Sequence, residues 1–492
     1  MSVWRVKPVS AFEADMKKND LKRVLTRWGL TSLGIGAIIG GGIFTLTGIA
    51  AHDYAGPALA LAFVIAGIGC LFASLCYAEF ASVLPVEGSA YAYAYGTVGE
   101  LFAWFIGWNL ILEYMMGATT VAVAWSGYFV KLLHLFGIEF PIWLCNDMAT
   151  ATEKSLAANL AAPSFAFNLP AFLITWVVTA ILVKGIKEAA KTNNIIVIIK
   201  IAVVLFVIIV GAFYVKTENW VPFIPDEIPA LDELGNATGK MNFGFGGVLT
   251  AATIVFFAYI GFDAVSTQAG EAINPKKDVP FAIVASLIIC TVLYILVSLV
   301  LTGMVKYTEL DRAAPVASAF SGIGINWAVF IITIAATAGL TSVMLVMMLG
   351  QTRIFLGMAK DGLMPAFFKV LHPVFKTPYK STILVGGLIS LVAAFTPIER
   401  VSEMCSMGTL LAFAMVCVAV MILRYKKPEL ERPYKTPAVY LVGTLGVAFN
   451  LFLMTQVRAA TWNFFLIWGV LGVIVYFIYG KRNSNLEKQG IE

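Results

Sequence analysis

Long apolar runs, each about the length that a helix needs to cross a bilayer, dominate the sequence. Sixty per cent of the residues are hydrophobic and only 13% are charged, whereas a typical soluble domain has about 25% charged residues. So little charge cannot cover the surface of a soluble protein of this size. The excess apolar surface must therefore face lipid, and we expect an integral membrane protein built from α-helices.

The apolar runs divide into about 12 transmembrane helices of roughly 20 residues joined by short loops. We place these helices at 30–50, 57–84, 98–133, 168–187, 190–215, 245–271, 280–305, 325–358, 381–398, 402–424, 438–457 and 460–480. Two of these segments, 98–133 and 325–358, are longer than one bilayer crossing, so we expect them to tilt or protrude. The predicted fold class is an all-α membrane protein.

Basic residues gather in segments that an even number of spans places on one side of the membrane. These segments are 1–28, 359–380, 424–437 and 481–492, and the opposite side carries the acidic stretch 218–233. Because cytoplasmic loops hold the excess of Lys and Arg, we predict a multi-pass protein of the cell membrane with both termini in the cytoplasm. The net charge of +5 is explained by these loops and does not indicate a nucleic-acid partner.

Glycines interrupt the first and the sixth predicted spans near their centres. Gly40, Gly41 and Gly42 are consecutive in the first span, and the sixth contains the sequence Phe256-Phe-Ala-Tyr-Ile-Gly-Phe262. Because these spans are an odd number of crossings apart, they traverse the membrane in opposite directions. This is the arrangement expected of a 5+5 inverted repeat with discontinuous helices 1 and 6, here followed by two C-terminal helices.

Three consecutive glycines are unfavourable in a helix interior, by about 1 kcal/mol each relative to alanine. One interpretation is a broken helix whose free amides bind a carboxylate and whose free carbonyls bind an ammonium group. The alternative is close packing of helices through small residues. The matching interruption in the sixth span favours the broken helix. A phosphate-binding loop is not supported, because no Gly-Lys-Ser/Thr follows the glycines.

Lys200 lies within the apolar run 195–210, roughly 13 Å deeper than Lys191, at which the span begins. Placing a charged side chain at such a depth costs about 3 kcal/mol. A lysine in this environment can alternate between its neutral and charged forms, which makes Lys200 a candidate proton carrier. The alternative is a side chain that extends to the membrane interface, and the depth of Lys200 makes that reach poor.

Four acidic residues lie within or near predicted spans: Glu79, Glu113, Asp263 and Glu271. Glu113 is deep in the third span, where it could meet a substrate cation, bind a proton or form a structural pair. Asp263 follows the interruption in the sixth span, where a gating or proton role fits its position. Glu79 and Glu271 lie near cytoplasmic span ends and are predicted to form structural or gate pairs.

Residue patterns of enzymes and metal sites do not occur in the sequence. The three His residues lie in loops or at span ends, and no His-Glu-x-x-His or Gly-x-Ser-x-Gly motif is present. Of the six Cys residues, only Cys145 lies in a loop, so no disulfide or metal framework is implied. We therefore expect no catalytic residues, no metal and no cofactor.

A series of motifs covering nearly the whole chain resembles the amino acid–polyamine–organocation superfamily. The motifs are Gly-Ala-Ile-Ile-Gly-Gly-Gly-Ile-Phe (36–44), Gly-Ser-Ala-Tyr-Ala-Tyr (88–93), Gly-Trp-Asn-Leu-Ile-Leu (107–112), Phe-Ala-Tyr-Ile-Gly-Phe-Asp (257–263), Glu-Ala-Ile-Asn-Pro-Lys-Lys-Asp-Val-Pro (271–280), Arg-Ile-Phe-Leu-Gly-Met-Ala-Lys-Asp-Gly (353–362) and Arg-Pro-Tyr-Lys-Thr-Pro (432–437). The subgroup that they resemble contains the cationic amino acid transporters and their bacterial relatives, including proton-coupled ones. The resemblance implies the inverted-repeat fold and amino acid transport.

The resemblance also implies a set of site residues. The substrate carboxylate should meet the amides of Gly41, Gly42 and Ile43, and the α-ammonium should meet carbonyls near Ile38, Phe257 and Ile260. Lys200 matches a lysine of a proton-coupled relative in which the ammonium replaces a sodium ion. Its neighbours should then be the Gly36 carbonyl and Ser342.

Two positions depart from the animal members of the subgroup and affect the expected substrate. Met347 matches a position that walls the side-chain pocket, and animal cationic transporters have a smaller residue there. A bulky Met favours small neutral substrates such as alanine over arginine. Glu113 replaces a small polar residue and could partly restore a preference for cations.

The sequence thus favours a proton-coupled L-amino acid transporter that works by alternating access. An exchanger without net proton flow and a non-transporting membrane sensor are the alternatives. The expected organisation is an N-terminal segment (1–28), a first repeat (29–216), an outer loop (217–244), a second repeat (245–424), two further helices (425–480) and a tail (481–492). Expected partners are the amino acid and membrane lipid, and a single-span accessory subunit is compatible with the resemblance.

Overall fold

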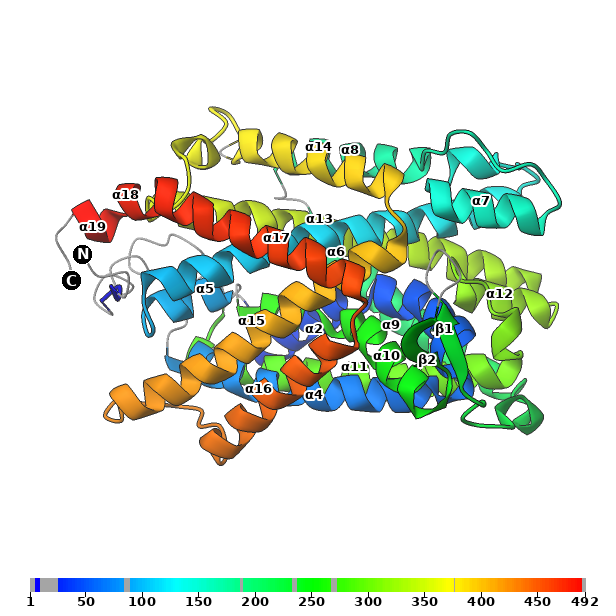
Figure 1. The fold of residues 1–492 in the computed structure, drawn as a ribbon, viewed down its shortest axis with the longest axis horizontal. Helices are drawn as coiled ribbons and strands as arrows, with labels where there is room; N and C mark the ends of the chain where they lie inside the picture. The colour runs from blue at the N-terminus through cyan, green and yellow to red at the C-terminus, as the bar shows by residue number, and fades with distance from the viewer. Residues whose placement is uncertain are drawn as a thin grey trace.

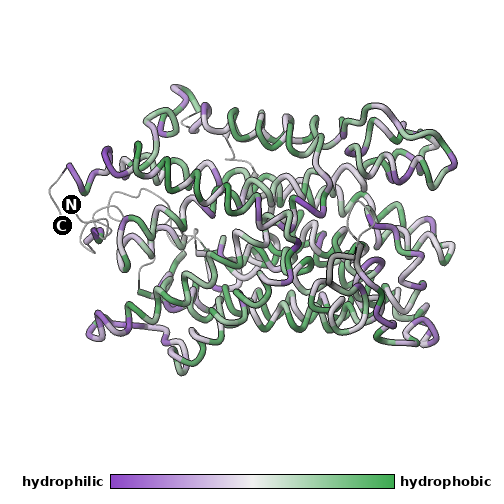
Figure 2. Tube along the Cα trace, in the orientation of Figure 1, coloured by the Kyte–Doolittle hydropathy of each residue, from purple (hydrophilic) through white to green (hydrophobic). Residues whose placement is uncertain are grey.

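A computed structural model describes residues 5–8, 25–83, 89–185, 189–231, 237–266, 272–375 and 377–488, and the structural statements below concern these residues. Long helices run along one axis of the molecule (Figure 1). Hydrophobic residues follow the lengths of these helices, and hydrophilic residues gather at the two ends of the bundle (Figure 2). This distribution is expected of helices whose middle parts lie in the hydrocarbon core of a membrane.

Eight helical segments within the described residues are long and apolar enough to cross a membrane. They contain α4 (Leu59–Val83), α6 (Glu100–Leu135), α10 (Gly244–Val255), α11 (Pro275–Met304), α13 (Asn326–Lys360), α15 (Ile398–Lys426), α16 (Val439–Gln456) and α17 (Ala459–Val475). Shorter apolar stretches lie in α8 (Leu169–Lys184), α9 (Ala189–Ala212) and α14 (Tyr379–Phe395). The chain is therefore a multi-pass membrane protein, while the number of twelve spans and the inverted repeat stay predictions.

Large apolar side chains on the bundle surface agree with this conclusion. On α17, for example, Phe464, Leu466, Ile467 and Val470 are all more than half exposed within the isolated chain. A soluble monomer rarely exposes such a continuous apolar surface. Lipid is the medium in which these side chains are stable.

Both predicted helix interruptions are present in the structure. The helix α2 (Arg27–Ile38) ends at Ile39, whose backbone is extended, and the chain resumes as π-helical turns at Gly42–Leu46 and Ala50–Ala55 on either side of α3 (Thr47–Ile49). The second helix, α10, continues as a 3-10 turn (Phe256–Tyr259) and is then broken by an extended Ile260 and by Gly261 at φ +122°.

The two interruptions pack directly against each other. A Cβ atom on Gly42 would lie 2.2 Å from the Cα of Ala258, and one on Gly261 would lie 2.9 Å from the backbone of Ala37. Real Cβ atoms do not approach other atoms so closely. Glycine at both positions is therefore what allows the two broken segments to touch.

Short elements cover the two ends of the bundle (Figure 1). One end, which we call the terminus end, carries α5 (Ser89–Tyr95), α18 (Lys481–Asn483) and α19 (Asn485–Lys488). The opposite end, the hairpin end, carries α7 (Met148–Ala157), α12 (Pro315–Gly322) and a two-stranded antiparallel sheet of β1 (Ile228–Leu231) and β2 (Ala237–Asn242). This hairpin lies in the predicted loop 217–244, so a strictly all-α class was wrong for that segment.

Candidate functional site

The first break leaves backbone amides without partners inside the helix. Gly41 precedes the π-helical turn that starts at Gly42, and the amides of the first turn of a helix, here those of Gly42 and Ile43, have no acceptor within that helix. The next amide, that of Phe44, donates to the Gly40 carbonyl at 3.2 Å. Because the positive end of the helix dipole lies at the same point, this position suits a carboxylate.

The space beside this break is bounded by α6 and α13. A Cβ on Gly41 would lie in ordinary contact with Ala124 and Val121 of α6, at 3.6 and 3.7 Å, and with Leu340 of α13, at 3.8 Å. One turn further along α13 from Leu340, Val343 lies against Gly40. The first break therefore lies against α6 and α13.

Tyr294 of α11 connects the two breaks, a role that the sequence did not reveal. Its hydroxyl lies 2.9 Å from the Ile38 carbonyl and 3.0 Å from the Ala258 carbonyl. A hydroxyl has one hydrogen to donate, so at any moment one of these two carbonyls lacks it. The Phe257 carbonyl accepts from the Ile260 amide at 3.2 Å. These carbonyl oxygens can accept further hydrogen bonds, so a cationic group can bind here.

Two other tyrosines bond the broken segments to neighbouring helices, one from α6 and one from the second broken segment itself. Tyr128 of α6 donates to the Phe44 carbonyl at 2.6 Å, and Tyr259 donates to the Phe63 carbonyl of α4 at 2.7 Å. Both side chains are fully buried. The only sequence signal for these two residues is that they are tyrosines within apolar runs. Tyrosines are common in membrane proteins for other reasons, so this signal does not reveal their contacts.

Lys200 of α9 lies between α2 and α13. The side chain is buried, and its ammonium donates to the Gly36 carbonyl at 2.8 Å. A Cβ on Gly36 would lie 2.2 Å from Val197, and one on Gly339 of α13 would lie 3.0 Å from the Lys200 side chain. Ser342 is buried on α13, one turn from Gly339. Across the described residues, no acidic side chain forms an ion pair with Lys200.

Glu113 of α6 is a buried carboxylate whose two oxygens have no hydrogen-bond partner among the described residues. The thiol of Cys405 on α15 donates to the Glu113 carbonyl, at 3.1 Å, and not to its carboxylate. The next residue, Tyr114, donates to the Asp263 carboxylate at 3.3 Å, and the Gly261 amide donates to the same side chain. The two carboxyl groups are close enough to interact electrostatically.

Met347 of α13 meets α6 one turn from Glu113. A Cβ on Gly117 would lie 3.4 Å from the Met347 sulfur and 3.4 Å from the Cys405 sulfur. On α13, Met347 follows Val343 by one turn, about 6 Å, and Val343 contacts Gly40 at the first break. The structure thus brings Met347 to α6 at Gly117, one turn from Glu113, while Lys200 contacts α13 at Gly339.

Comparisons of the sequence with known proteins show which family it resembles. The family model described as amino acid permease matches residues 25–478. The branched-chain amino acid permease BcaP of Bacillus subtilis is 44% identical over 489 residues, which cover 99% of both chains. A methylthioribose transporter of the same organism is 42% identical over 99% of this chain and 100% of its own length. The vacuolar cationic amino acid transporter 4 of Arabidopsis thaliana is 37% identical over 84% of this chain and 66% of its own.

Proposed function

The chain belongs to the amino acid permease family, and from that premise we propose that it is a secondary active transporter that takes up L-amino acids together with protons by alternating access. The family and the relatives are transporters, so the chain is not an enzyme. The observation that carries the proposal is the contact between two broken helical segments, whose unpaired backbone groups suit the two charges that every α-amino acid carries.

In this proposal the substrate binds across the two breaks. Its carboxylate accepts from the amides of Gly41, Gly42 and Ile43, at the positive end of a helix dipole. Its ammonium donates to carbonyls near Ile38, Phe257 and Ile260. The shared Tyr294 hydroxyl supports this assignment, because it can donate to only one of its two carbonyls at a time.

Lys200 is the proposed proton carrier. A protonated ammonium holds α2 against α9 through the Gly36 carbonyl. Loss of the proton weakens this bond and frees the first broken segment to move, which links proton release to conformational change. Ser342 completes the surroundings of Lys200, and Asp263, beside the second break, has a gating or proton role. The proton gradient is the energy source, and no cofactor is needed.

Met347 and Glu113 line the proposed pocket for the substrate side chain and set its preference. The Met347 sulfur lies against α6 at Gly117 and limits the room for a long side chain, which favours alanine and similar small residues. The unpartnered carboxylate of Glu113 leaves a place for a cationic side chain such as that of arginine. The names of the relatives include branched-chain, cationic and methylthioribose substrates, and these compounds define the range to test.

We place the protein in the cell membrane with its terminus end in the cytoplasm. The basic residues of the 424–437 segment and of the tail support this orientation. The moving group would comprise α2, α4, α10 and α11, and the static group α6, α8, α9, α13, α14 and α15. Lipid surrounds the bundle, and an accessory subunit is not needed for the proposed cycle.

A competition binding panel on the purified protein tests the substrate assignment. Radiolabelled alanine is displaced with alanine, leucine, arginine, glutamate and methylthioribose. We expect alanine to compete best, arginine more weakly and glutamate least, because Glu113 repels an acidic side chain. Absence of specific alanine binding by a protein that binds radiolabelled methylthioribose would contradict an amino acid site.

A further inference from the structure

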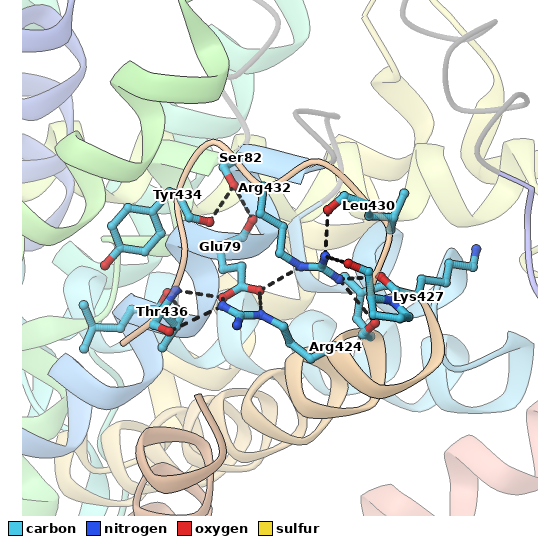
Figure 3. Close-up of polar contacts among 11 residues, drawn as sticks. Glu79, Ser82, Arg424, Lys427, Leu430, Arg432, Tyr434 and Thr436 are labelled. Carbon is cyan, nitrogen blue, oxygen red and sulfur yellow. Dashed lines mark hydrogen bonds and ion pairs between the residues drawn. The ribbon is translucent and has the colours of Figure 1, made fainter. Parts of the chain in front are cut away.

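A buried carboxylate at the terminus end joins α4 to α15 and to the segment between α15 and α16 (Figure 3). We call this segment, residues 427–438, the linker. Glu79, near the end of α4, has a fully buried side chain. Its oxygens accept from the Arg424 guanidinium at 2.7 and 2.8 Å and from the Thr436 amide at 2.8 Å, and Arg432 lies 3.3 Å away.

The linker is fastened to α4 on both sides of Glu79. The Thr436 hydroxyl donates to the Leu75 carbonyl at 2.8 Å, and the Ser82 hydroxyl donates to the Tyr434 carbonyl at 3.3 Å. Arg432 shapes the linker from within, since it donates to three linker carbonyls, those of Lys427, Pro428 and Leu430 (Figure 3). The linker therefore follows the last two turns of α4 as one fixed unit.

Close packing continues from this cluster toward the middle of the bundle. A Cβ on Gly446 of α16 would lie 2.7 Å from the Cys417 sulfur of α15 and 3.2 Å from the Phe72 side chain of α4. Cys76 of α4 is close enough to Cys417 for the two thiols to interact electrostatically. Three helices thus pack closely here around Gly446.

Two other sets of ion pairs that join separate elements are more exposed at their basic side chains, whereas the Arg5–Glu100 pair is as buried as the Glu79 cluster. Arg312, which pairs with Asp53 and Glu153 at the hairpin end, has a side chain that is 38% exposed. Arg27, which pairs with Asp278 at the terminus end, is 47% exposed. Exposed pairs separate at little cost because water replaces the lost partner. A buried carboxylate with all its donors in place is strongly destabilised when its partners leave.

We propose that Glu79 is a positioning residue that makes the terminus end of α4 a fixed pivot for the conformational change. α4 packs along α11 of the proposed moving group and is bound, at Glu79, to α15 and the linker. The exposed pairs of Arg312 open and close, whereas the Glu79 cluster stays closed throughout the cycle. This inference rests on the proposed transport function and assigns a purpose to the Arg-Pro-Tyr-Lys-Thr-Pro motif, which supplies the linker contacts.

The first test replaces Glu79 with glutamine, which keeps the size of the side chain and removes its charge. The matched control is Glu431→Gln, an exposed residue of the same linker. We expect Glu79→Gln to bind alanine with unchanged affinity while the turnover of uptake falls about tenfold, as for substitutions at hinges, and Glu79→Asp to recover part of the rate. Wild-type turnover in Glu79→Gln would overturn the proposal.

The second test uses the native thiols and separates a pivot from a gate. Mild oxidation joins Cys76 to Cys417 in a disulfide, with one electron passing to each of two Cu(II) centres of the added copper–phenanthroline and two protons passing to water. Mass spectrometry measures the joined fraction. We expect that fraction to retain uptake, with Cys417→Ser as the control that cannot be joined. Loss of uptake in step with disulfide formation, or failure of the thiols to join, would overturn the fixed pivot. Absence of uptake before oxidation would instead refute the proposed function.

Discussion

Gly42 is the residue at which the two broken segments approach most closely. A Cβ there would lie 2.2 Å from the backbone of Ala258, which cannot move aside as a flexible side chain could. We therefore expect Gly42→Ala to destabilise the protein by about 3 kcal/mol or more and to abolish alanine binding. Gly357→Ala is the control, because a methyl group on this residue of α13 would have no neighbour within 4 Å. Thermal unfolding and binding of both variants check this, and a stable, binding-competent Gly42→Ala would contradict the packing account.

Lys200 provides a second test at a single position. Replacement by alanine removes the bond to the Gly36 carbonyl and the only proposed proton carrier. We expect Lys200→Ala to lose uptake driven by a pH gradient. The control is Lys184→Ala, at the exposed end of α8. Measurement of alanine uptake into liposomes with an inside-alkaline gradient decides the point, and undiminished uptake by Lys200→Ala would remove the lysine from the mechanism.

Met347 sets the expected limit on substrate size. Met347→Ser shortens the side chain that faces Gly117 and opens room beside Glu113. We expect the affinity for arginine to rise about tenfold, since one good charge-assisted contact contributes roughly 1.5 kcal/mol or more. Met348→Ser controls for the cost of the cavity, because the next residue points about 100° away around the helix. Unchanged arginine affinity in Met347→Ser would count against the assignment of Met347 to the pocket wall.

The residues that sequence reasoning found are those that an apolar span makes conspicuous. Lys200 and Glu113 stand out because a charge in an apolar run is unfavourable, and the structure places both in the interior. Tyr294 escaped notice, because its importance comes from two carbonyls that only the fold brings within reach of one hydroxyl. The same holds for Gly117 and Gly339, whose value lies in what packs against them.

At the scale of elements, hydropathy located helices more accurately than it defined their ends. The predicted segments 98–133 and 325–358 correspond to α6 and α13, because a long apolar run that crosses a membrane must be helical. The hairpin of β1 and β2 was missed, since short strands in a polar connection lack the periodicity that identifies a strand. Glu271 lies outside the described residues, so its predicted pairing stays a prediction.

The hairpin end offers an element-scale prediction. Arg312, between α11 and α12, pairs with Asp53 at 2.6 Å and with Glu153 of α7 at 2.5 Å. Because these pairs are partly exposed, we expect Arg312→Gln to change the free energy of unfolding by less than about 1 kcal/mol. We also expect it to increase labelling of Leu340→Cys, beside Gly41, by an impermeant thiol reagent added outside. Both proteins also carry Cys145→Ser, which removes a native thiol from the labelling experiment. Unchanged labelling would show that the Arg312 ion pairs do not keep the hairpin end closed.

At the scale of the whole molecule, we expect burial to decide which polar contacts persist during transport. The Glu79 carboxylate is fully buried and its partner Arg424 is 23% exposed, whereas Arg312 and Arg27 are 38% and 47% exposed. Composition alone identified the membrane environment, because 13% charge cannot solvate a chain of 492 residues. Composition does not identify which contacts persist, since that depends on burial in the folded bundle.

The central claim is that amino acid uptake is coupled to protons, and uptake into liposomes that contain no internal amino acid tests it most directly. We predict that the purified protein accumulates alanine when an inside-alkaline pH gradient is imposed and that it carries protons inward in the same experiment. Uptake that requires internal amino acid and does not respond to the gradient would contradict the claim and identify an exchanger.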